Sequence, residues 1–202
     1  MKTVLVTGGT TRLGAAIAAR LRADGWRVLT SSHRPDAGAD VVSDLTQPGA
    51  AEALFAACGQ LDAIVNNAAL FRGTRETLMA LNVTAPERLM ELVRERGGSV
   101  VNILDTRIVG AQADRQVDAY SMSKAILLRL TEQFARASRP DFRVNAVAPG
   151  PVLVPVGVHE KAGALLTARP TADDVAAAVA FLLDAPSVTG CILPVDGGQH
   201  LL

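Results

Sequence analysis

The sequence predicts a single α/β domain of the doubly wound Rossmann type, with a seven-stranded parallel sheet and helices on both faces. Three observations lead to this prediction. Strand-like and helix-like segments alternate along almost all of the 202 residues. The strand-like segments are nearly continuous apolar runs, as expected for strands buried on both faces. A glycine-containing loop at residues 8–14 joins the first strand to the first helix.

The strands are predicted from short runs of β-branched and apolar residues between glycine, proline and polar residues. These runs are 2–7, 26–30, 40–43, 61–65, 99–104, 142–147 and 191–195. Because helical segments separate them, we expect right-handed crossovers between parallel strands.

The helices are predicted from apolar residues that recur every three or four positions. They are 15–22, 48–58, 74–96, 117–137 and 173–183, with a bend in the third at Pro86. Residues 149–155 are irregular and precede a short helix-like piece at 158–166. After the sixth strand, this stretch is predicted to be a reduced lid over a ligand site, with a plain connector as the alternative.

Composition limits the classes of function. Lys and Arg together number 20, as do Asp and Glu, so nothing favours a nucleic-acid or anionic-membrane partner. Cys58 and Cys191 are expected to be reduced thiols, and three scattered histidines predict no metal site. Neither a signal peptide nor a membrane-spanning run is recognised, so a single cytoplasmic domain over residues 1–202 is expected.

Tyr120 and Lys124 are the first candidate catalytic pair. They are four residues apart on a predicted helix, so their side chains should lie on one face. An ammonium beside a phenol favours the phenolate, and we therefore expect a lowered pKa for Tyr120. The pair would then donate or accept a proton. The spacing alone is common, and a chance pair is the alternative.

The loop at residues 8–14 predicts a dinucleotide site, because glycines allow close approach of a pyrophosphate to a helix N-terminus. A tight strand–helix turn is the alternative. The second strand ends in Ser31, Ser32, His33 and Arg34, without a carboxylate before Asp36. Hydroxyl and guanidinium groups suit a 2′-phosphate, so the sequence favours NADPH over NADH. A solvated loop charge is the alternative for Arg34.

Several motifs occur in the order and spacing of the short-chain dehydrogenase/reductase family, which the chain resembles over nearly its whole length. They are residues 7–14, 66–69, Asn82, 120–124, 149–150 and 196–198. The resemblance implies that Tyr120 is the general acid and that Lys124 lowers its pKa and binds the nicotinamide ribose. It also implies that Asn82 anchors a water in the proton relay.

The loop chemistry and the resemblance together give the expected cofactor contacts. Residues 67–69 would line the cofactor, and residues 44–45 would hold the adenine ring. The full set is Gly8, Thr11, Arg12, Leu13, Gly14, Ser31, Ser32, His33, Arg34, Asp44, Leu45, Asn67, Ala68, Ala69, Tyr120, Lys124, Pro149 and Gly150.

Two positions depart from the family pattern. Arg12 stands where the family has glycine, and Asp105 stands where it has a catalytic serine after the fifth strand. A serine hydroxyl donates to a ketone oxygen, whereas an ionised aspartate cannot donate and would repel an alkoxide. An aspartate can accept from the N–H of a nitrogen heterocycle or pass on a proton. The departure therefore favours reduction of a C=N bond.

Both departures together look like the pteridine reductases and the bacterial dihydromonapterin or dihydrofolate reductases of this family. That branch implies that Arg12 contacts phosphate and pterin, that Asp105 works with Tyr120, and that Phe71 stacks on the substrate ring. A core anchor is the alternative for Phe71. Ala69 lacks the hydroxyl that some pteridine reductases place against the pterin, which leaves the natural substrate open.

The leading functional prediction is NADPH-dependent reduction of a reduced pterin or similar C=N compound, with Arg12, Phe71, Asp105 and Tyr120 at the substrate. The alternatives are a general NADPH-dependent carbonyl or imine reductase and a non-catalytic NADP-binding regulator. The resemblance also implies a homotetramer or homodimer, paired through helices 74–96 and 117–137. Leu127, Leu128 and Phe134 suit such an interface or an ordinary core.

Overall fold

A computed structural model describes residues 1–112, 118–137, 140–152 and 165–202. Its seven strands form one all-parallel sheet in the order β3-β2-β1-β4-β5-β6-β7, which confirms the predicted fold class. The strands are β1 (Thr3–Thr7), β2 (Arg27–Ser32), β3 (Val41–Val42), β4 (Ala63–Asn66), β5 (Gly98–Ile103), β6 (Phe142–Pro149) and β7 (Ile192–Val195).

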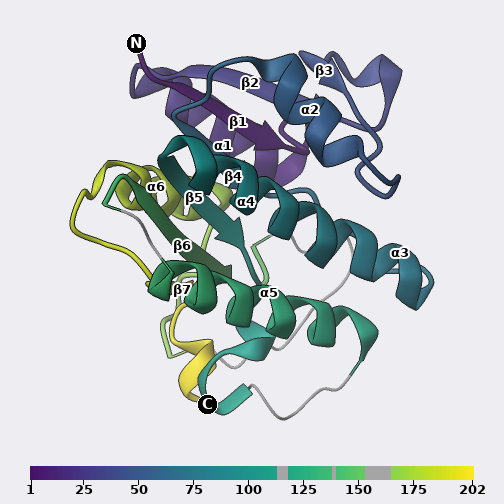
Figure 1. The fold of residues 1–202 in the computed structure, drawn as a ribbon. Helices are drawn as coiled ribbons and strands as arrows, with labels where there is room; N and C mark the ends of the chain where they lie inside the picture. Colours follow the sequence, from purple (N-terminus) through teal and green to yellow (C-terminus); the bar gives the residue numbers. More distant parts are fainter. Residues whose placement is uncertain (113–117, 138–139, 153–164) are drawn as a thin grey trace.

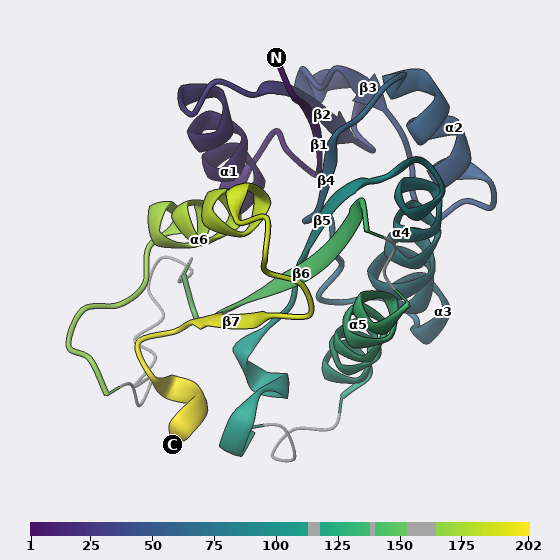
Figure 2. The same ribbon diagram turned by 60° about the vertical axis from the view of Figure 1, so that its left-hand side comes forward.

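The helices cover both faces of this sheet. The α-helices are α1 (Arg12–Ala23), α2 (Ala50–Cys58), α3 (Arg75–Met79), α4 (Ala85–Arg96), α5 (Ala119–Arg136) and α6 (Ala172–Asp184). The shorter helical turns are η1 (Pro35–Ala37), η2 (Ala80–Thr84), η3 (Thr106–Ile108), η4 (Gly110–Gln112) and η5 (Gln199–Leu201). Helices α1 and α6 lie on one face, and α2, α4 and α5 lie on the other (Figures 1 and 2).

Alternation along each strand divides the core into two layers. In β1, Val4 and Val6 pack toward α1 and α6, while Leu5 packs toward α2, α4 and α5. Burial of apolar side chains on both faces is the main stabilising contribution in such a domain. Leu127 and Phe134, suggested as interface residues, are 1% and 6% exposed and belong to this core, with Leu128 packed against it. They therefore give no support to a second interface.

The long helix predicted over residues 74–96 contains a π-helical turn that the sequence did not predict. Helix α3 continues through η2, a π-helical segment, into α4. Pro86 lies in the first turn of α4 and does not end the helix. It has no N–H to donate to the carbonyl of Asn82, four residues before it, and the wider π turn accommodates this loss.

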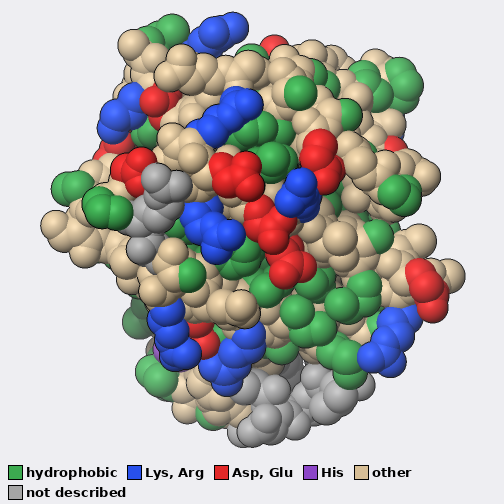
Figure 3. Space-filling model, viewed as in Figure 1, with side chains coloured by type: hydrophobic (Ala, Val, Ile, Leu, Met, Phe, Trp, Pro, Cys, Tyr) green, Lys and Arg blue, Asp and Glu red, His purple; other side chains and the backbone are tan. Residues whose placement is uncertain are grey.

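Other expectations have mixed outcomes. Cys58 and Cys191 are free thiols, and burial raises the pKa of Cys58 to about 11. The expected lid and helical piece around Pro155 and residues 158–166 lie largely outside the described residues. Among the described helices, none has the length and apolar character needed to cross a bilayer. Figure 3 shows Lys, Arg, Asp and Glu side chains interspersed on one face, in keeping with the balanced composition.

Candidate active site

The predicted site residues gather at the carboxyl ends of the strands. Gly8 follows β1, Asn67 follows β4, Asp105 lies two residues beyond β5, and Gly150 follows β6. The parallel arrangement of these four strands brings the residues to one edge of the sheet, where ligands bind in open α/β folds.

The glycine loop fits a nucleotide phosphate. A Cβ on Gly14 would lie only 2.1 Å from the carbonyl oxygen of Gly8, so the loop packs tightly on the start of α1. Gly8 itself has a φ of 62°, in the region that favours glycine. The N-cap residue Thr11 makes no side-chain hydrogen bond, which leaves the first-turn N–H groups free to bind an anion.

Asn67 holds the glycine loop in place. Its Nδ2 donates to the carbonyl oxygens of Thr7 and Gly8, at 2.9 and 3.2 Å. The backbone N–H groups of Asn67 and Ala68 both donate to the Thr7 hydroxyl at 3.0 Å. Asn67 therefore supports the loop through its side chain, while Ala69 is exposed beside it.

Arg12 adopts a backbone conformation suited to glycine. Its φ is 50°, and it is the one non-glycine residue with positive φ in the described part of the chain. This left-handed conformation costs about 1–2 kcal/mol for a residue with a Cβ. The exposed side chain makes no ion pair or hydrogen bond with any described residue. Its guanidinium is thus available to a ligand, and the contact with phosphate and substrate that the resemblance implies stays a prediction.

The residues expected to contact the adenosine end of the cofactor differ in solvent accessibility. Ser31 is 2% exposed, whereas Ser32, His33 and Arg34 are more accessible. Arg34 donates to both carboxylate oxygens of Asp36, at 3.2 and 2.9 Å, an ion pair that the sequence analysis did not predict.

At the adenine position, only one of the two expected residues is exposed. Asp44 is exposed and accepts hydrogen bonds from Thr46 and Gln47. Leu45 packs its side chain into the core at 7% exposure, which leaves its backbone for any contact with the cofactor. Leu13, in the first turn of α1, likewise packs against the core.

Tyr120 and Asp105 are brought together as expected. Tyr120 lies in the first turn of α5, where Asp118 caps the helix by accepting from the Ser121 N–H at 2.6 Å. The Tyr120 hydroxyl donates to Asp105 Oδ2 at 3.1 Å. Lys124, one turn later, is 3% exposed and donates to the Ile103 carbonyl oxygen at 2.7 Å. Its ammonium lies 5.9 Å from the centre of the Tyr120 ring.

The expected lowering of the Tyr120 pKa is wrong for this arrangement. Burial raises the pKa of the phenol, and the charge and hydrogen bond of Asp105 raise it further. Burial also lowers the pKa of Lys124 to about 8. The four-residue spacing places the two side chains together, but desolvation outweighs the attraction between ammonium and phenolate. Tyr120 is therefore held as a neutral phenol, the form that donates a proton.

The Lys124 shift gives a prediction for pH dependence. Lys124 is protonated below about pH 8 and neutral above it. If the ammonium binds the cofactor, kcat/KM for the cofactor will be level below about pH 8 and decline above it. This parameter reports groups of the free enzyme. Initial rates at limiting cofactor test this, with kcat as the comparison; a level profile up to pH 10 would contradict it.

Asn82 connects the loop after β4 to α5. It is fully buried in the π-helical segment η2, donates to Leu70 O at 2.8 Å and Ser123 Oγ at 3.0 Å, and accepts from the Leu70 N–H at 2.9 Å. π-helical turns are frequent at functional sites. The side-chain amide is thus engaged by protein groups, and its role as a water anchor stays a prediction.

Phe71 is not a core residue. Its side chain is 51% exposed, and its ring lies edge-on to Tyr120 with centroids 4.8 Å apart. A half-exposed ring beside the Tyr120 phenol can stack on a flat ligand. The stacking alternative therefore fits the structure, and the core-anchor alternative is wrong.

Arg107 is a candidate that the sequence analysis missed. Its guanidinium lies 4.9 Å from the Phe71 ring centre, 5.7 Å from the Tyr120 ring centre and 3.6 Å from Asp105 Oδ1. The one signal for it in the sequence is its position two residues beyond Asp105, and an arginine in a loop is usually an ordinary solvated charge.

The carboxyl-terminal segment supports the loop that carries Asp105. Buried Asp196 accepts from the Thr106 hydroxyl, from the N–H of His200 at 2.8 Å and from that of Gly198 at 2.9 Å, and it pairs with the His200 ring. Gly150 packs against Asp196, because a Cβ there would meet the Asp196 Cβ at 2.8 Å. The neighbouring Pro149 is buried at the end of β6. Residues 149–150 thus have a structural role beside any contact with the cofactor.

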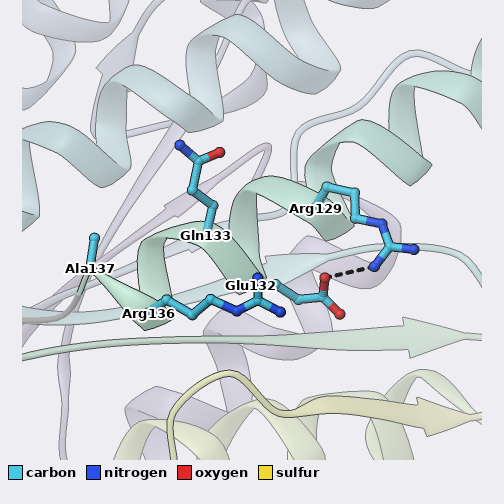
Figure 4. A pocket seen from close by; sticks show the side chains of 5 residues that line it. All are labelled: Arg129, Glu132, Gln133, Arg136 and Ala137. Carbon is cyan, nitrogen blue, oxygen red and sulfur yellow. Dashed lines mark hydrogen bonds and ion pairs between the residues drawn. The ribbon is translucent and has the colours of Figure 1, made fainter.

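One hollow of the described surface lies away from these residues. It is on the carboxyl half of α5, lined by Arg129, Glu132, Gln133, Arg136 and Ala137, with an Arg129–Glu132 ion pair of 2.8 Å (Figure 4). Tyr120 lies at the opposite end of the same helix. None of the candidate site residues lines this hollow, and we assign no ligand to it.

Comparison with known proteins places these features in a family. Residues 10–200 match the family model described as enoyl-(acyl carrier protein) reductase. A Streptomyces violaceoruber protein, named as ketoacyl reductase 2 of the granaticin polyketide synthase, is 32% identical over 240 residues, covering 98% of this chain and 96% of the relative. Dihydromonapterin reductase of Escherichia coli (strain SMS-3-5) is 30% identical, with coverages of 98% and 96%.

A solved structure agrees. The FolM alternative dihydrofolate reductase 1 from Brucella canis, complexed with NADP, superposes with a TM-score of 0.86 at 30% identity, covering 98% of this chain and 94% of that one. The fold and these matches define an oxidoreductase that uses a nicotinamide cofactor. The chain belongs to the short-chain dehydrogenase/reductase family. Its 202 residues align over 240 positions with the Streptomyces relative, so that relative carries segments absent here.

Proposed function

We propose that the protein reduces a pterin-like C=N bond, converting a dihydropterin or dihydrofolate to the tetrahydro form with NADPH. The observation that carries this proposal is the hydrogen bond from the Tyr120 hydroxyl to the Asp105 carboxylate. A bound nicotinamide supplies the hydride. Tyr120 supplies the proton to the substrate nitrogen, and Asp105 passes a second proton from solvent to the phenolate, which restores the phenol.

Two further side chains support a flat heterocyclic substrate. Phe71 offers a half-exposed ring next to Tyr120, and stacking on such a ring gains about 0.5–1.5 kcal/mol beyond area burial. Arg12 offers a guanidinium without a partner in the described residues, at the start of α1. The names of the Escherichia coli and Brucella canis relatives point in the same direction.

The direct test is NADPH oxidation by the purified protein with dihydropterins, dihydrofolate and simple ketones. We expect kcat/KM for a dihydropterin to exceed that for the ketones by at least about 100-fold, because an ionised Asp105 cannot donate to a ketone oxygen. A preference for ketones would contradict the proposal.

The second candidate is a general NADPH-dependent carbonyl or imine reductase. The Streptomyces relative, named as a ketoacyl reductase, is the observation that favours it. Under this alternative, ketones or simple imines would be reduced well and dihydropterins ignored in the same assay. A protein that binds NADPH and turns over none of these compounds would instead fit a regulator.

The proposed preference for NADPH gives a prediction at Asp36. This carboxylate holds the Arg34 guanidinium, and exposed ion pairs of this kind are weak. Asp36→Asn should release Arg34 and remove a charge that repels a 2′-phosphate, lowering KM for NADPH by about two- to fivefold. KM for NADH should not change. Arg34→Met is the matched variant and should raise KM for NADPH; equal effects on both cofactors would contradict the assignment.

We also propose a cytoplasmic homotetramer or homodimer that pairs through α4 and α5. This proposal rests on the resemblance alone, since Leu127 and Phe134 belong to the core. Sedimentation of the purified protein tests it, and a monomer at micromolar concentration would contradict it.

A further inference from the structure

Arg107 lies at the centre of the candidate active site without a role in the mechanism above. Its guanidinium lies near both aromatic rings and 3.6 Å from Asp105 Oδ1. About one third of its side chain is exposed. The backbone holds it there, since its own N–H donates to Asp105 Oδ1 at 3.0 Å in the turn η3.

The donors of Arg107 are available. No carboxylate, carbonyl or hydroxyl of the described residues lies within hydrogen-bond distance of its guanidinium, and the Asp105 contact is longer than a hydrogen bond. A guanidinium carries five N–H donors and no acceptor. The guanidinium carbon lies 4.9 Å from the Phe71 ring centre, and this contact uses none of the N–H donors.

Arg107 and Asp105 together present a donor beside an acceptor. Asp105 Oδ2 accepts from Tyr120, while Oδ1 faces the guanidinium and, among the described residues, accepts only from the Arg107 backbone N–H. A carboxylate oxygen has room for a second hydrogen bond. A ring edge that carries an oxo group next to an N–H offers the complementary acceptor and donor.

We propose that Arg107 is a specificity-determining residue, which donates to an oxo oxygen on the edge of a flat heterocycle whose adjacent N–H is bound by Asp105. The inference rests on the proposed function only for the identity of the ring. The substrate class would be cyclic amides that stack on Phe71. The role of Arg107 differs from that of Arg12, which lies at the start of α1.

Binding without turnover tests the inference independently of the reaction. The probes are fully oxidised pterin and 2,4-diaminopteridine, in which an amino group replaces the oxo oxygen. Each is titrated into the NADP-loaded protein and followed by its own fluorescence. We expect pterin to bind about 10- to 100-fold more tightly, the range for a hydrogen bond to a charged group.

Arg107→Met should bring the two dissociation constants within about threefold of each other, mainly by weakening the binding of pterin. Arg72→Met is the matched control, because Arg72 is an exposed arginine next to Phe71, and it should retain the preference. Thermal melts of both variants confirm folding. Arg107→Lys, which keeps the charge but loses the planar fork, should fall between wild type and Arg107→Met.

The outcomes separate the two proposals. If pterin preference depends on Arg107 but dihydropterins are not reduced, the inference stands and the proposed function fails. If dihydropterins are reduced but the preference survives Arg107→Met, the inference is overturned alone. The inference is also overturned if the wild type does not bind pterin, or if Arg107→Met weakens the binding of both probes equally.

Discussion

Tyr120→Phe is expected to lower kcat for the preferred substrate by about 10²–10⁴-fold, the range for loss of a positioned proton donor. The substitution removes only the hydroxyl that donates to Asp105 and keeps the ring beside Phe71. Cofactor affinity, measured by fluorescence titration, should stay within about twofold of the wild type. The two readouts together distinguish loss of chemistry from loss of the site.

Ser121→Ala is the matched control for this experiment. Ser121 lies on the same turn of α5, and its buried side chain lies beside the Asp118 carboxylate. Removing its hydroxyl should leave kcat unchanged, because this hydroxyl takes no part in the Tyr120–Asp105 hydrogen bond. Normal turnover by the Tyr120→Phe variant would refute the assignment of Tyr120 as the acid.

Asp105→Ser is expected to lower kcat/KM for a dihydropterin by about 10²-fold and to produce measurable ketone reduction. The serine restores a hydroxyl that donates to a ketone oxygen and removes the carboxylate that pairs with Tyr120. Serine is also a good cap, so it can replace Asp105 at the start of η3. Parallel assays with a dihydropterin and a ketone measure the change in preference.

Asp118→Asn is the charge control for Asp105→Ser. It removes a carboxylate near Tyr120 while asparagine preserves the cap of α5. Dihydropterin reduction by this variant should stay within a few-fold of the wild type. If Asp105→Ser keeps full dihydropterin activity, the argument that the aspartate selects a C=N substrate is lost.

The fold followed from the sequence because its signals are local. Apolar strands, helical periodicity and the glycine loop each depend on neighbouring residues. The Tyr120–Asp105 contact was also expected, because a helix fixes the direction of Tyr120 and the end of β5 fixes that of Asp105. Nothing in the spacing of Tyr120 and Lys124 reports their burial, however, and burial decides the pKa of both.

Arg107 and the Arg34–Asp36 pair show why other contacts of the candidate site could not be predicted from the sequence. Arg107 acquires its surroundings from Phe71, which belongs to a loop 36 positions earlier in the chain. Arg34 and Asp36 are close in sequence, but their pairing depends on the side-chain conformations at η1. The π-helical segment was missed because one wide turn barely changes the apolar pattern of residues 74–96.

That wide turn makes the helix from Arg75 to Arg96 intolerant of a change in length. A π turn holds one residue more than an α turn, so one residue fewer in η2 would restore ordinary helical winding and change the directions of the side chains within the turn. Asn82 would turn away from Leu70 and Ser123, and the loop that presents Phe71 would lose its attachment to α5. A single codon deletion in this turn would therefore detach the loop that carries Phe71 from α5.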